Sequence, residues 1–458
     1  MTQLACPRLL IAGVSSGVGK TTFTVGLCRA LLRRGLRVSV FKCGPDYLDP
    51  TYHRQASRGA VHNLDSWLMP EVALRETFVR NAAAADVSLI EGVMGLFDGA
   101  SPTTLSGSSA EIAQLLAAPI TLVCDASGMA RSVAAVIAGF AHFEPGIAPA
   151  AVICNRVGSA GHLALLRSAT PLAAPILGGL PKSVAQRFPE RHLGLVAAQE
   201  LERDLEPILE AWADLVEAHC DVDALLALAR TAPPLPAATL APRSTTARCR
   251  IGVAKDAAFH FYYDANLRLL EEAGAELVEF SPLTAATLPP VDGLYIGGGY
   301  PELHAARLSA NSTLLRQLRE HGARGKPIYA ECGGLMYLAD AIVDRSGERH
   351  ELAGLIPGVA VMQPKLQALG YVSVATRAAS PLGPAGTRYR GHQFRYSNFH
   401  TEHVPGRLEL QTTRSDSTQL EGYGRGAVLG SYVHGHWASN PAIAEAFVAA
   451  CVAARTLP

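Results

Sequence analysis

Apolar runs of strand length alternate with helical patterns along the first half of the chain. The expected strands are Leu9–Val14, Val38–Lys42, Ser88–Gly92, Ile120–Asp125, Ala151–Asn155 and Pro175–Gly178. This alternation predicts a doubly wound α/β domain with a parallel sheet, in which ligands bind at the carboxyl ends of the strands. The polar residues at those ends are Lys42, Asp46, Glu91, Asp98, Asp125 and Asn155.

The pattern changes around residues 231–248, where four prolines lie in a stretch without helical or strand periodicity. We interpret this stretch as a linker between a domain of residues 1–230 and a second α/β domain of residues 249–458. The strands expected in the second domain are Ile251–Ala254, Glu276–Phe280, Gly293–Ile296 and Pro327–Ala330. Shorter runs predict an antiparallel extension of its sheet, at Gly370–Ala375, Arg388–Phe399 and Ala427–Val433.

Composition narrows the class of protein. The chain has 458 residues, 49% of them hydrophobic, which is enough for two or more domains with large cores. Its formal net charge is zero, so no basic excess favours nucleic acid. We expect a cytoplasmic protein without a membrane span, because the sequence has no signal-peptide pattern and no apolar run near ~20 residues. The nine cysteines contain no C-x-x-C pair, which argues against a disulfide framework and structural zinc.

The segment from Gly13 to Thr22 carries the strongest chemical signal. It lies between an expected strand and a helix whose apolar residues are Phe23, Leu27, Ala30 and Leu31. A glycine-rich turn in this context binds phosphates through backbone N–H groups, a lysine and a hydroxyl that ligates Mg²⁺; the alternative is a turn that only caps a helix. The predicted ATP-binding residues are Ser15, Ser16, Gly17, Val18, Gly19, Lys20, Thr21 and Thr22. The standard spacing requires glycine at position 14, where Val14 stands, so Gly13 comes one residue early.

Charged residues at neighbouring strand ends extend this nucleotide site. Lys42 can neutralise the terminal phosphate of ATP. The predicted Mg²⁺ ligands are Thr21, Asp46 and Glu91, because this ion prefers one or two carboxylates beside phosphate oxygens. A lone carboxylate would be a solvated loop residue or a helix cap, but several beside a P-loop favour a metal site. Asn155 is a candidate to bind the base, and a simple turn asparagine is the alternative.

A second reactive site is predicted at Cys332, which lies between an apolar strand and a glycine pair that starts a helix. A nucleophile there is exposed on a sharp elbow, and the helix N-terminus favours its thiolate. His434 is the expected base, whereas His436 has a structural alternative. The expected oxyanion donors are Gly298, Gly299 and Gly333. A lone cysteine is more often a buried small hydrophobe, but the elbow, the glycines and the histidine together favour catalysis.

Taken together, these residues resemble one family nearly end to end: the glutamine-dependent a,c-diamide synthases of corrinoid biosynthesis, which act on cobyrinate or hydrogenobyrinate. The segments that carry the resemblance are the P-loop, Lys42–Tyr47, Asn63–Trp67, Glu91–Gly99, Phe259–Tyr263, Gly297–Glu302, the Cys332 elbow, Gly391–Ser397 and Tyr432–His434. The resemblance implies a dethiobiotin-synthetase-like P-loop domain followed by a class I glutamine amidotransferase domain.

The resemblance also implies a mechanism. Cys332, assisted by His434, would release ammonia from glutamine through a thioester. ATP with Mg²⁺ would phosphorylate the a and c acetate carboxylates of the tetrapyrrole in turn, and ammonia would replace each phosphate. By the same resemblance, three residues match positions near the acyl-acceptor site: Tyr47, Leu48 and Asp98.

Two departures from related families bear on this interpretation. Many amidotransferase triads have His-x-Glu, but His436 stands at the acid's position, so we assign no third catalytic residue. Partition ATPases carry a second lysine where Ser15 stands, which weakens the alternative of a dimerising switch ATPase. A regulatory ATPase with an inactive glutaminase domain is a further alternative, and the intact Cys332 and His434 argue against it.

The substrate stays open between cobyrinate, hydrogenobyrinate and nickel–sirohydrochlorin. Cobyric acid synthase, which shares both domains, is the runner-up, although residues 42–47 and 390–397 favour the diamide enzymes. Candidate partners for the ring carboxylates are Arg390, His392 and Arg395, for which structural salt bridges are the alternative. We expect a homodimer.

Overall fold

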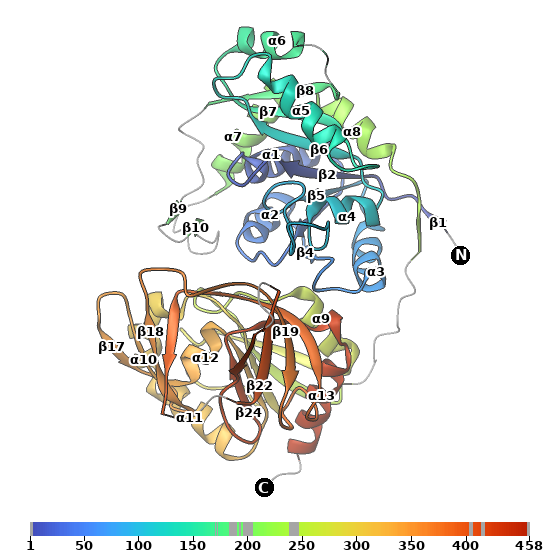
Figure 1. The fold of residues 1–458 in the computed structure, drawn as a ribbon. Helices are drawn as coiled ribbons and strands as arrows, with labels where there is room; N and C mark the ends of the chain where they lie inside the picture. Colours follow the sequence, from blue (N-terminus) through green and yellow to red (C-terminus); the bar gives the residue numbers. More distant parts are fainter. Residues whose placement is uncertain are drawn as a thin grey trace. The chain divides into compact units, whose positions relative to one another are not determined.

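The chain forms two compact units, Met1–Leu240 and Ala241–Pro458, in a computed structural model (Figure 1). The structure describes residues 3–169, 171, 173–182, 190–191, 194–195, 205–237, 247–402, 406–413 and 417–455. Within these ranges, no helix is long and apolar enough to cross a membrane.

The first unit is built on a seven-stranded parallel sheet with the order β4-β3-β5-β2-β6-β7-β8. Its strands are β2 (Arg8–Gly13), β3 (Val38–Cys43), β4 (Val61–Leu64), β5 (Val87–Glu91), β6 (Ile120–Asp125), β7 (Pro149–Val157) and β8 (Ile176–Pro181). Every residue of β2 is buried, as expected for the central strand of a sheet covered on both faces. The predicted doubly wound P-loop architecture is confirmed.

Helices flank this sheet, and one of them is buried between the sheet and another helix. They are α1 (Lys20–Arg33), α2 (Asp49–Ser57), α3 (Glu71–Ala82), α4 (Ser109–Leu115), α5 (Ser132–His142), α6 (Ala160–Ser168), α7 (Glu206–His219) and α8 (Val222–Arg230). Helix α7 packs on α1, where Arg29 pairs with Glu206 at 2.8 Å. Gly26 permits this approach, because a Cβ there would lie 2.6 Å from the Trp212 carbonyl oxygen.

Short strands complete the described part of this unit. They are β1 (Gln3–Leu4), β9 (Glu190–Arg191), β10 (Gly194–Leu195) and β11 (Leu235–Pro236). Strand β11 pairs with β1, so the predicted linker of residues 231–248 contains a strand that its sequence did not indicate. Residues 238–246 of that stretch lie outside the described residues.

The second unit holds a five-stranded parallel sheet with the order β13-β12-β14-β15-β24. Its strands are β12 (Cys249–Ala254), β13 (Ala275–Phe280), β14 (Gly293–Ile296), β15 (Ile328–Glu331) and β24 (Val428–Ser431). The helices of this unit are α9 (Asp264–Glu272), η2 (Pro301–His304), α10 (Ala305–Ala310), α11 (Ser312–Ala323), α12 (Gly333–Leu338), η3 (Trp437–Ser439) and α13 (Ala442–Ala454).

The predicted antiparallel extension of this sheet is wrong. The run Ala427–Val433 contains β24, which joins this sheet in parallel rather than antiparallel. The other two runs lie in two separate sheets, with the orders β17-β16-β18-β21 and β23-β22-β19-β20-β25. Their strands are β16 (Ala339–Val343), β17 (Arg349–Glu351), β18 (Ile356–Met362), β19 (Ala368–Thr376), β20 (Arg388–Arg395), β21 (Ser397–His400), β22 (Leu408–Thr412), β23 (Thr418–Glu421) and β25 (His434–His436). The run Arg388–Phe399 divides between both sheets, because an apolar pattern specifies a buried face but not the neighbouring strand.

Candidate active sites

The P-loop turns sharply between β2 and α1. Gly17 and Gly19 have φ angles of 73° and 97°, a region that favours glycine, and α1 begins at Lys20. Position 13, one residue before the standard place, requires glycine for a steric reason. A Cβ on Gly13 would lie 2.7 Å from Val18 Cγ2 and 3.0 Å from Lys20 Nζ. Ser15, Ser16 and Gly17 are exposed at the tip of the loop, as a phosphate-binding segment requires.

The P-loop lysine is held against the segment that follows β5. Lys20 Nζ donates to the carbonyl oxygens of Met94 at 2.6 Å and Ser15 at 3.1 Å. Burial, and next the nearby charge of Lys42, lower the pKa of Lys20 to about 8. An anion at this position would counter both effects, so the lysine is prepared for a phosphate.

The predicted metal ligands Thr21 and Glu91 are brought together. Thr21 Oγ1 donates to Glu91 Oε1 at 2.8 Å, and Lys42 Nζ lies 2.9 Å from the same carboxylate oxygen. Burial would raise the pKa of Glu91, but the charges of Lys42 and His53 hold it well below its usual range. His53 Nε2 lies 2.6 Å from Glu91 Oε2. Glu91 therefore stays ionised although it is fully buried.

Asp46 is placed differently from its neighbour Asp49. Asp46 Oδ1 accepts from the backbone N–H groups of Leu48 and Asp49 at the start of α2, and Oδ2 lies 3.8 Å from Lys42 Nζ. Asp49 Oδ2 approaches closer, at 2.7 Å from Lys42 Nζ and 3.4 Å from Thr21 Oγ1. Thr21, Asp49 and Glu91 thus offer a hydroxyl and two carboxylates at one place, a set of hard oxygen ligands that fits Mg²⁺.

Asp49 and His53 lie in the same cluster, although the sequence pattern did not single them out. They lie one helical turn apart at the start of α2, so both face the end of β5. Burial, and next the charge of Asp46, raise the pKa of Asp49 to about 7. The sequence signal that could have pointed to Asp49 and His53 is their i, i+4 spacing directly after the Lys42–Tyr47 segment.

The other residues predicted for the nucleotide and acceptor sites lie around the same strand ends. Asn155 Nδ2 donates to the Val18 carbonyl oxygen at 2.8 Å, so this side chain contacts the P-loop at the end next to α1. Asp98 is exposed, and its Oδ2 accepts from Gly95 N–H at 2.8 Å. Tyr47 and Leu48 are partly buried immediately before α2.

Cys332 lies on the elbow between β15 and α12. Its φ of 48° and ψ of −101° are unusual for a residue with a side chain, which indicates backbone strain at the predicted nucleophile. The strain is fixed by the hydrogen bond from Cys332 N–H to the Ser431 carbonyl oxygen at 2.7 Å. Because β15 and β24 are adjacent and parallel, the nucleophile and the segment that leads to His434 leave the same edge of the sheet.

The glycines after β14 surround the predicted nucleophile and base. A Cβ on Gly333 would lie 3.1 Å from Gly299 N, and a Cβ on Gly298 would lie 2.4 Å from His434 Cε1. The structure does not favour Gly298 as an oxyanion donor, because its N–H donates to the Phe261 carbonyl oxygen at 3.3 Å. Gly299 and Gly333 stay as the candidate donors, and Gly298 provides space for the imidazole.

The protonation states of Cys332 and His434 differ from the thiolate that the helix N-terminus led us to expect. Burial, and next the charge of Glu302, raise the pKa of the Cys332 thiol to about 12. Burial lowers the pKa of His434 to about 3. The six-residue α12 does not offset the burial of the thiol, so the expected thiolate is wrong for the unliganded protein. A neutral imidazole is able to accept the thiol proton as the nucleophile attacks.

Other buried polar groups surround His434, the predicted base. The His392 ring stacks on the His434 ring with centroids 5.0 Å apart, and Tyr263 Oη lies 3.0 Å from His392 Nδ1. His436 packs against the Tyr263 ring at 4.5 Å, which favours the structural alternative for this histidine. Glu331, which precedes Cys332 and was not assigned from the sequence, accepts from Gly435 N–H at 3.0 Å.

Comparison with known proteins covers both units. Residues 9–196 match the family model of the CobQ/CobB/MinD/ParA nucleotide binding domain, and residues 250–442 match that of the CobB/CobQ-like glutamine amidotransferase domain. The chain is 48% identical over 453 residues to a cobyrinate a,c-diamide synthase of Leptospira interrogans, covering 98% of this chain and 99% of that protein. It is 47% identical over 456 residues to one of Syntrophotalea carbinolica, covering 98% and 99%. It is 44% identical over 450 residues to a hydrogenobyrinate a,c-diamide synthase of Pseudomonas aeruginosa, again covering 98% and 99%.

Proposed function

The chain belongs to the cobyrinate a,c-diamide synthase family, whose members are glutamine-dependent amide-forming ligases of cobalamin biosynthesis, and we propose from this membership how its residues divide the reaction. The observation that supports the proposal best is that one chain carries both a P-loop with a carboxylate cluster and a cysteine elbow beside a buried histidine. Each arrangement serves one half of an amide ligation.

Ammonia is produced in the second unit. Cys332 Sγ attacks the side-chain amide carbon of glutamine while His434 accepts the thiol proton. Gly299 and Gly333 stabilise the oxyanion of the tetrahedral intermediate. His434 then protonates the departing nitrogen, ammonia leaves, and water hydrolyses the γ-glutamyl thioester to glutamate.

The acceptor is activated in the first unit. A carboxylate oxygen of the acceptor attacks the γ-phosphorus of ATP, and ADP leaves with its electron pair on the β-phosphate. Lys20 and the P-loop N–H groups stabilise the phosphate charge, while Lys42 balances the buried Glu91 and Asp49. Ammonia then attacks the acyl carbon and inorganic phosphate leaves. Mg²⁺, held by Thr21, Glu91 and Asp49, would supply further neutralisation of phosphate charge.

The acceptor we propose is cobyrinate, amidated at its a and c acetates. The relatives with 47–48% identity are named for that substrate, whereas the relative named for hydrogenobyrinate is 44% identical. Hydrogenobyrinate and nickel–sirohydrochlorin stay as alternatives within the same reaction. The homodimer, the cytoplasmic location and the domain limits 1–230, 231–248 and 249–458 stay predictions.

Product analysis tests this proposal. Purified protein is given ATP, Mg²⁺ and glutamine with cobyrinic acid, hydrogenobyrinic acid or nickel–sirohydrochlorin, and ADP release and macrocycle mass are measured. We expect two amides on cobyrinic acid, and we expect Cys332→Ala to abolish the reaction with glutamine but not with ammonium chloride. Four amides would indicate cobyric acid synthase. ATP hydrolysis without amidation of any macrocycle would favour the regulatory ATPase.

A further inference from the structure

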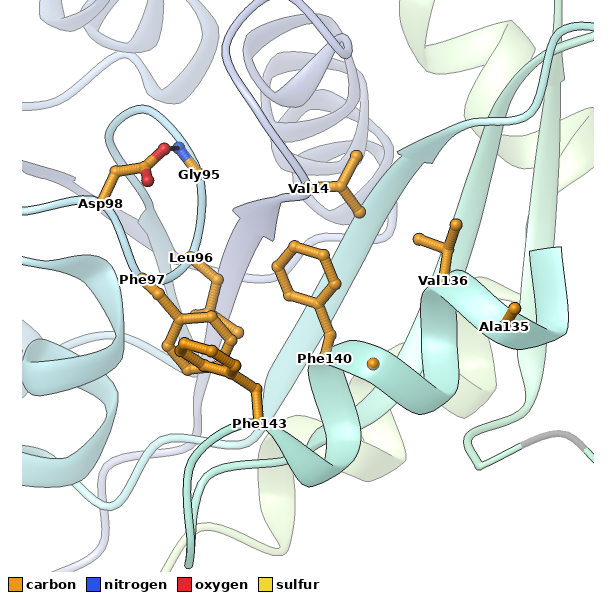
Figure 2. A pocket seen from close by; sticks show the side chains of 10 residues that line it. Val14, Gly95, Leu96, Phe97, Asp98, Ala135, Val136, Phe140 and Phe143 are labelled. Atoms are coloured by element: carbon orange, nitrogen blue, oxygen red, sulfur yellow. Dashed lines mark hydrogen bonds between the residues drawn. The ribbon is translucent and has the colours of Figure 1, made fainter. Parts of the chain in front are cut away.

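An apolar pocket of about 420 Å³ opens beside the P-loop of the first unit. Its volume lies within the range of ~300–1,000 Å³ that is usual for small-molecule sites. Figure 2 shows its lining residues, which are Val14, Gly95, Leu96, Phe97, Asp98, Ala135, Val136, Gly139, Phe140 and Phe143. We call it the aromatic pocket.

Three phenylalanines form the body of the aromatic pocket. The Phe97 ring stacks on Phe140 with centroids 5.6 Å apart and lies 5.0 Å from the Phe143 ring. Phe143 is 69% exposed, which is unusual for so large an apolar side chain. Among the described residues that line the pocket, Asp98, at the rim, is the only charged one. The pocket therefore fits an uncharged, apolar part of a ligand and disfavours a carboxylate.

The aromatic pocket adjoins the end of the P-loop where the terminal phosphate is expected. Lys20 Nζ, which reaches the terminal phosphates in such loops, contacts the Met94 carbonyl oxygen one residue before the pocket wall. The wall is tied to the loop by the hydrogen bond from Leu96 N–H to the Gly13 carbonyl oxygen at 2.8 Å. Asn155, the candidate to bind the base, contacts the loop at Val18 rather than at Gly13 and Val14. A group in the pocket thus lies beside the phosphate to be transferred, and the base of the nucleotide is expected on the other side.

We propose that the aromatic pocket holds an apolar edge of the tetrapyrrole ring while an acetate on the rim of the ring reaches the γ-phosphate. A tetrapyrrole combines a flat apolar ring with carboxylates on its rim, so only its ring matches three phenylalanines. The pocket is too small for the whole macrocycle, which leaves the charged rim outside. This inference rests on the proposed function and extends it by naming the surface that orients the acceptor.

Phe143→Ser is the direct test, because this exposed side chain is removable without opening the core. Val72→Ser, at another exposed apolar residue (68%) on α3 outside the pocket, is the matched control. We expect Phe143→Ser to raise the KM for cobyrinic acid about tenfold by removing apolar contact area. The KM for ATP and the glutaminase rate should stay unchanged, and Val72→Ser should resemble the wild type. Phe140→Leu, a milder change inside the pocket, should raise the same KM by a smaller factor.

Each other outcome contradicts the inference. An unchanged KM for cobyrinic acid in both pocket variants would exclude the ring from this pocket. A raised KM for ATP would assign the pocket to the nucleotide, and a smaller mass by light scattering in the variants alone would assign it to contact between copies of the chain. Equilibrium dialysis of cobyrinic acid with the wild-type protein separates the proposal for the pocket from the proposed function, because it measures binding of the tetrapyrrole independently of the pocket variants. Failure of the wild type to bind or amidate any tetrapyrrole would overturn the proposed function itself.

Discussion

The carboxylate of Glu331 accepts a hydrogen bond from the backbone N–H of Gly435 at 3.0 Å, and both residues are buried. The residue before the predicted nucleophile is thereby joined to the residue after the predicted base. Asn266 holds the other side of Gly435, with Nδ2 2.7 Å from its carbonyl oxygen. Since His-x-Glu is absent here, these two buried side chains hold the backbone of His434 against the Cys332 elbow.

Glu331→Ala is expected to lower the glutaminase rate at least tenfold, because a buried N–H loses its acceptor and the base loses its position. Glu331→Gln retains an acceptor of the same size and should keep most of the activity. Ammonia-dependent amidation should be normal in both variants, which separates this effect from misfolding. Glu276→Gln, at a half-exposed residue of β13, is the control. Equal rates for the wild type and Glu331→Ala would contradict the positioning role.

Glu331 should also make stability depend on pH. Burial raises its pKa from 4.5 to about 7, against hydrogen bonds from Gly435, Tyr329 and Tyr295 that favour the carboxylate. The folded state therefore retains a proton that the unfolded chain releases. The associated stability is complete below pH ~4.5 and is lost as the pH rises to ~7, amounting to about 3 kcal/mol. We expect Glu331→Gln to flatten the fall in Tm between pH 5 and pH 8, measured by calorimetry, and an unchanged slope would contradict this assignment.

Alkylation of Cys332 should be slow near neutral pH. Burial raises the pKa of this thiol to about 12, and only the thiolate reacts. We expect the rate of modification by iodoacetamide, followed by peptide mass spectrometry, to increase about tenfold per pH unit between pH 7 and pH 9. The Cys332→Ala variant is the control, because any alkylation that it shows comes from the other cysteines. A fast rate at pH 7 without this pH dependence would restore the thiolate predicted from the helix N-terminus.

The central strands were predictable because buried parallel strands are nearly continuous apolar runs. The expected and observed bounds of Ile120–Asp125 and Gly293–Ile296 agree to the residue. Val61–Leu64 was missed because this short edge strand contains the polar pair His62 and Asn63. The two smaller sheets of the second unit were not predictable, since strand partners depend on contacts distant in the sequence.

The candidate sites differ in the same way, between local sequence patterns and contacts that are distant in the sequence. Lys20, Thr21 and Cys332 could be proposed from the sequence because glycine turns after apolar strands are local patterns. His53 and Glu331 could not be proposed because their contacts are with distant partners, 38 residues away at Glu91 and 104 residues away at Gly435. A buried carboxylate next to a nucleophile carries no local signal.

Gly298→Ala should impair glutamine hydrolysis without affecting the synthetase reaction. The added Cβ would lie 2.4 Å from His434 Cε1 and 3.3 Å from Phe261 Cβ, so the imidazole must move. We expect at least a tenfold loss of glutaminase rate, because small displacements of a base are costly to catalysis. The rate with ammonium chloride should be unchanged. Gly406→Ala, where a Cβ makes ordinary contact with Arg377, is the control. A fully active Gly298→Ala protein would mean that His434 is not the base in the conformation described.

Asp49→Asn distinguishes the Mg²⁺ ligands that we propose from the fold from those predicted by sequence. Asp49 Oδ2 lies 3.4 Å from Thr21 Oγ1, whereas Asp46 uses one carboxylate oxygen to cap α2. We expect Asp49→Asn to reduce the gain in ATP affinity on adding Mg²⁺ roughly tenfold or more, since ligand loss weakens such sites by at least as much as the loss of a supporting residue.

Calorimetric titration of ATP, with Mg²⁺ and with EDTA, measures this gain without relying on turnover. Affinity in EDTA should change little, because the P-loop N–H groups and Lys20 are intact. Asp86→Asn, which removes a surface pair with Arg37, is the matched control and should behave as the wild type. If Asp49→Asn kept the full Mg²⁺ effect while Asp46→Asn lost it, the ligand set of Thr21, Asp46 and Glu91 would be the correct one, and α2 would have to shift when nucleotide binds.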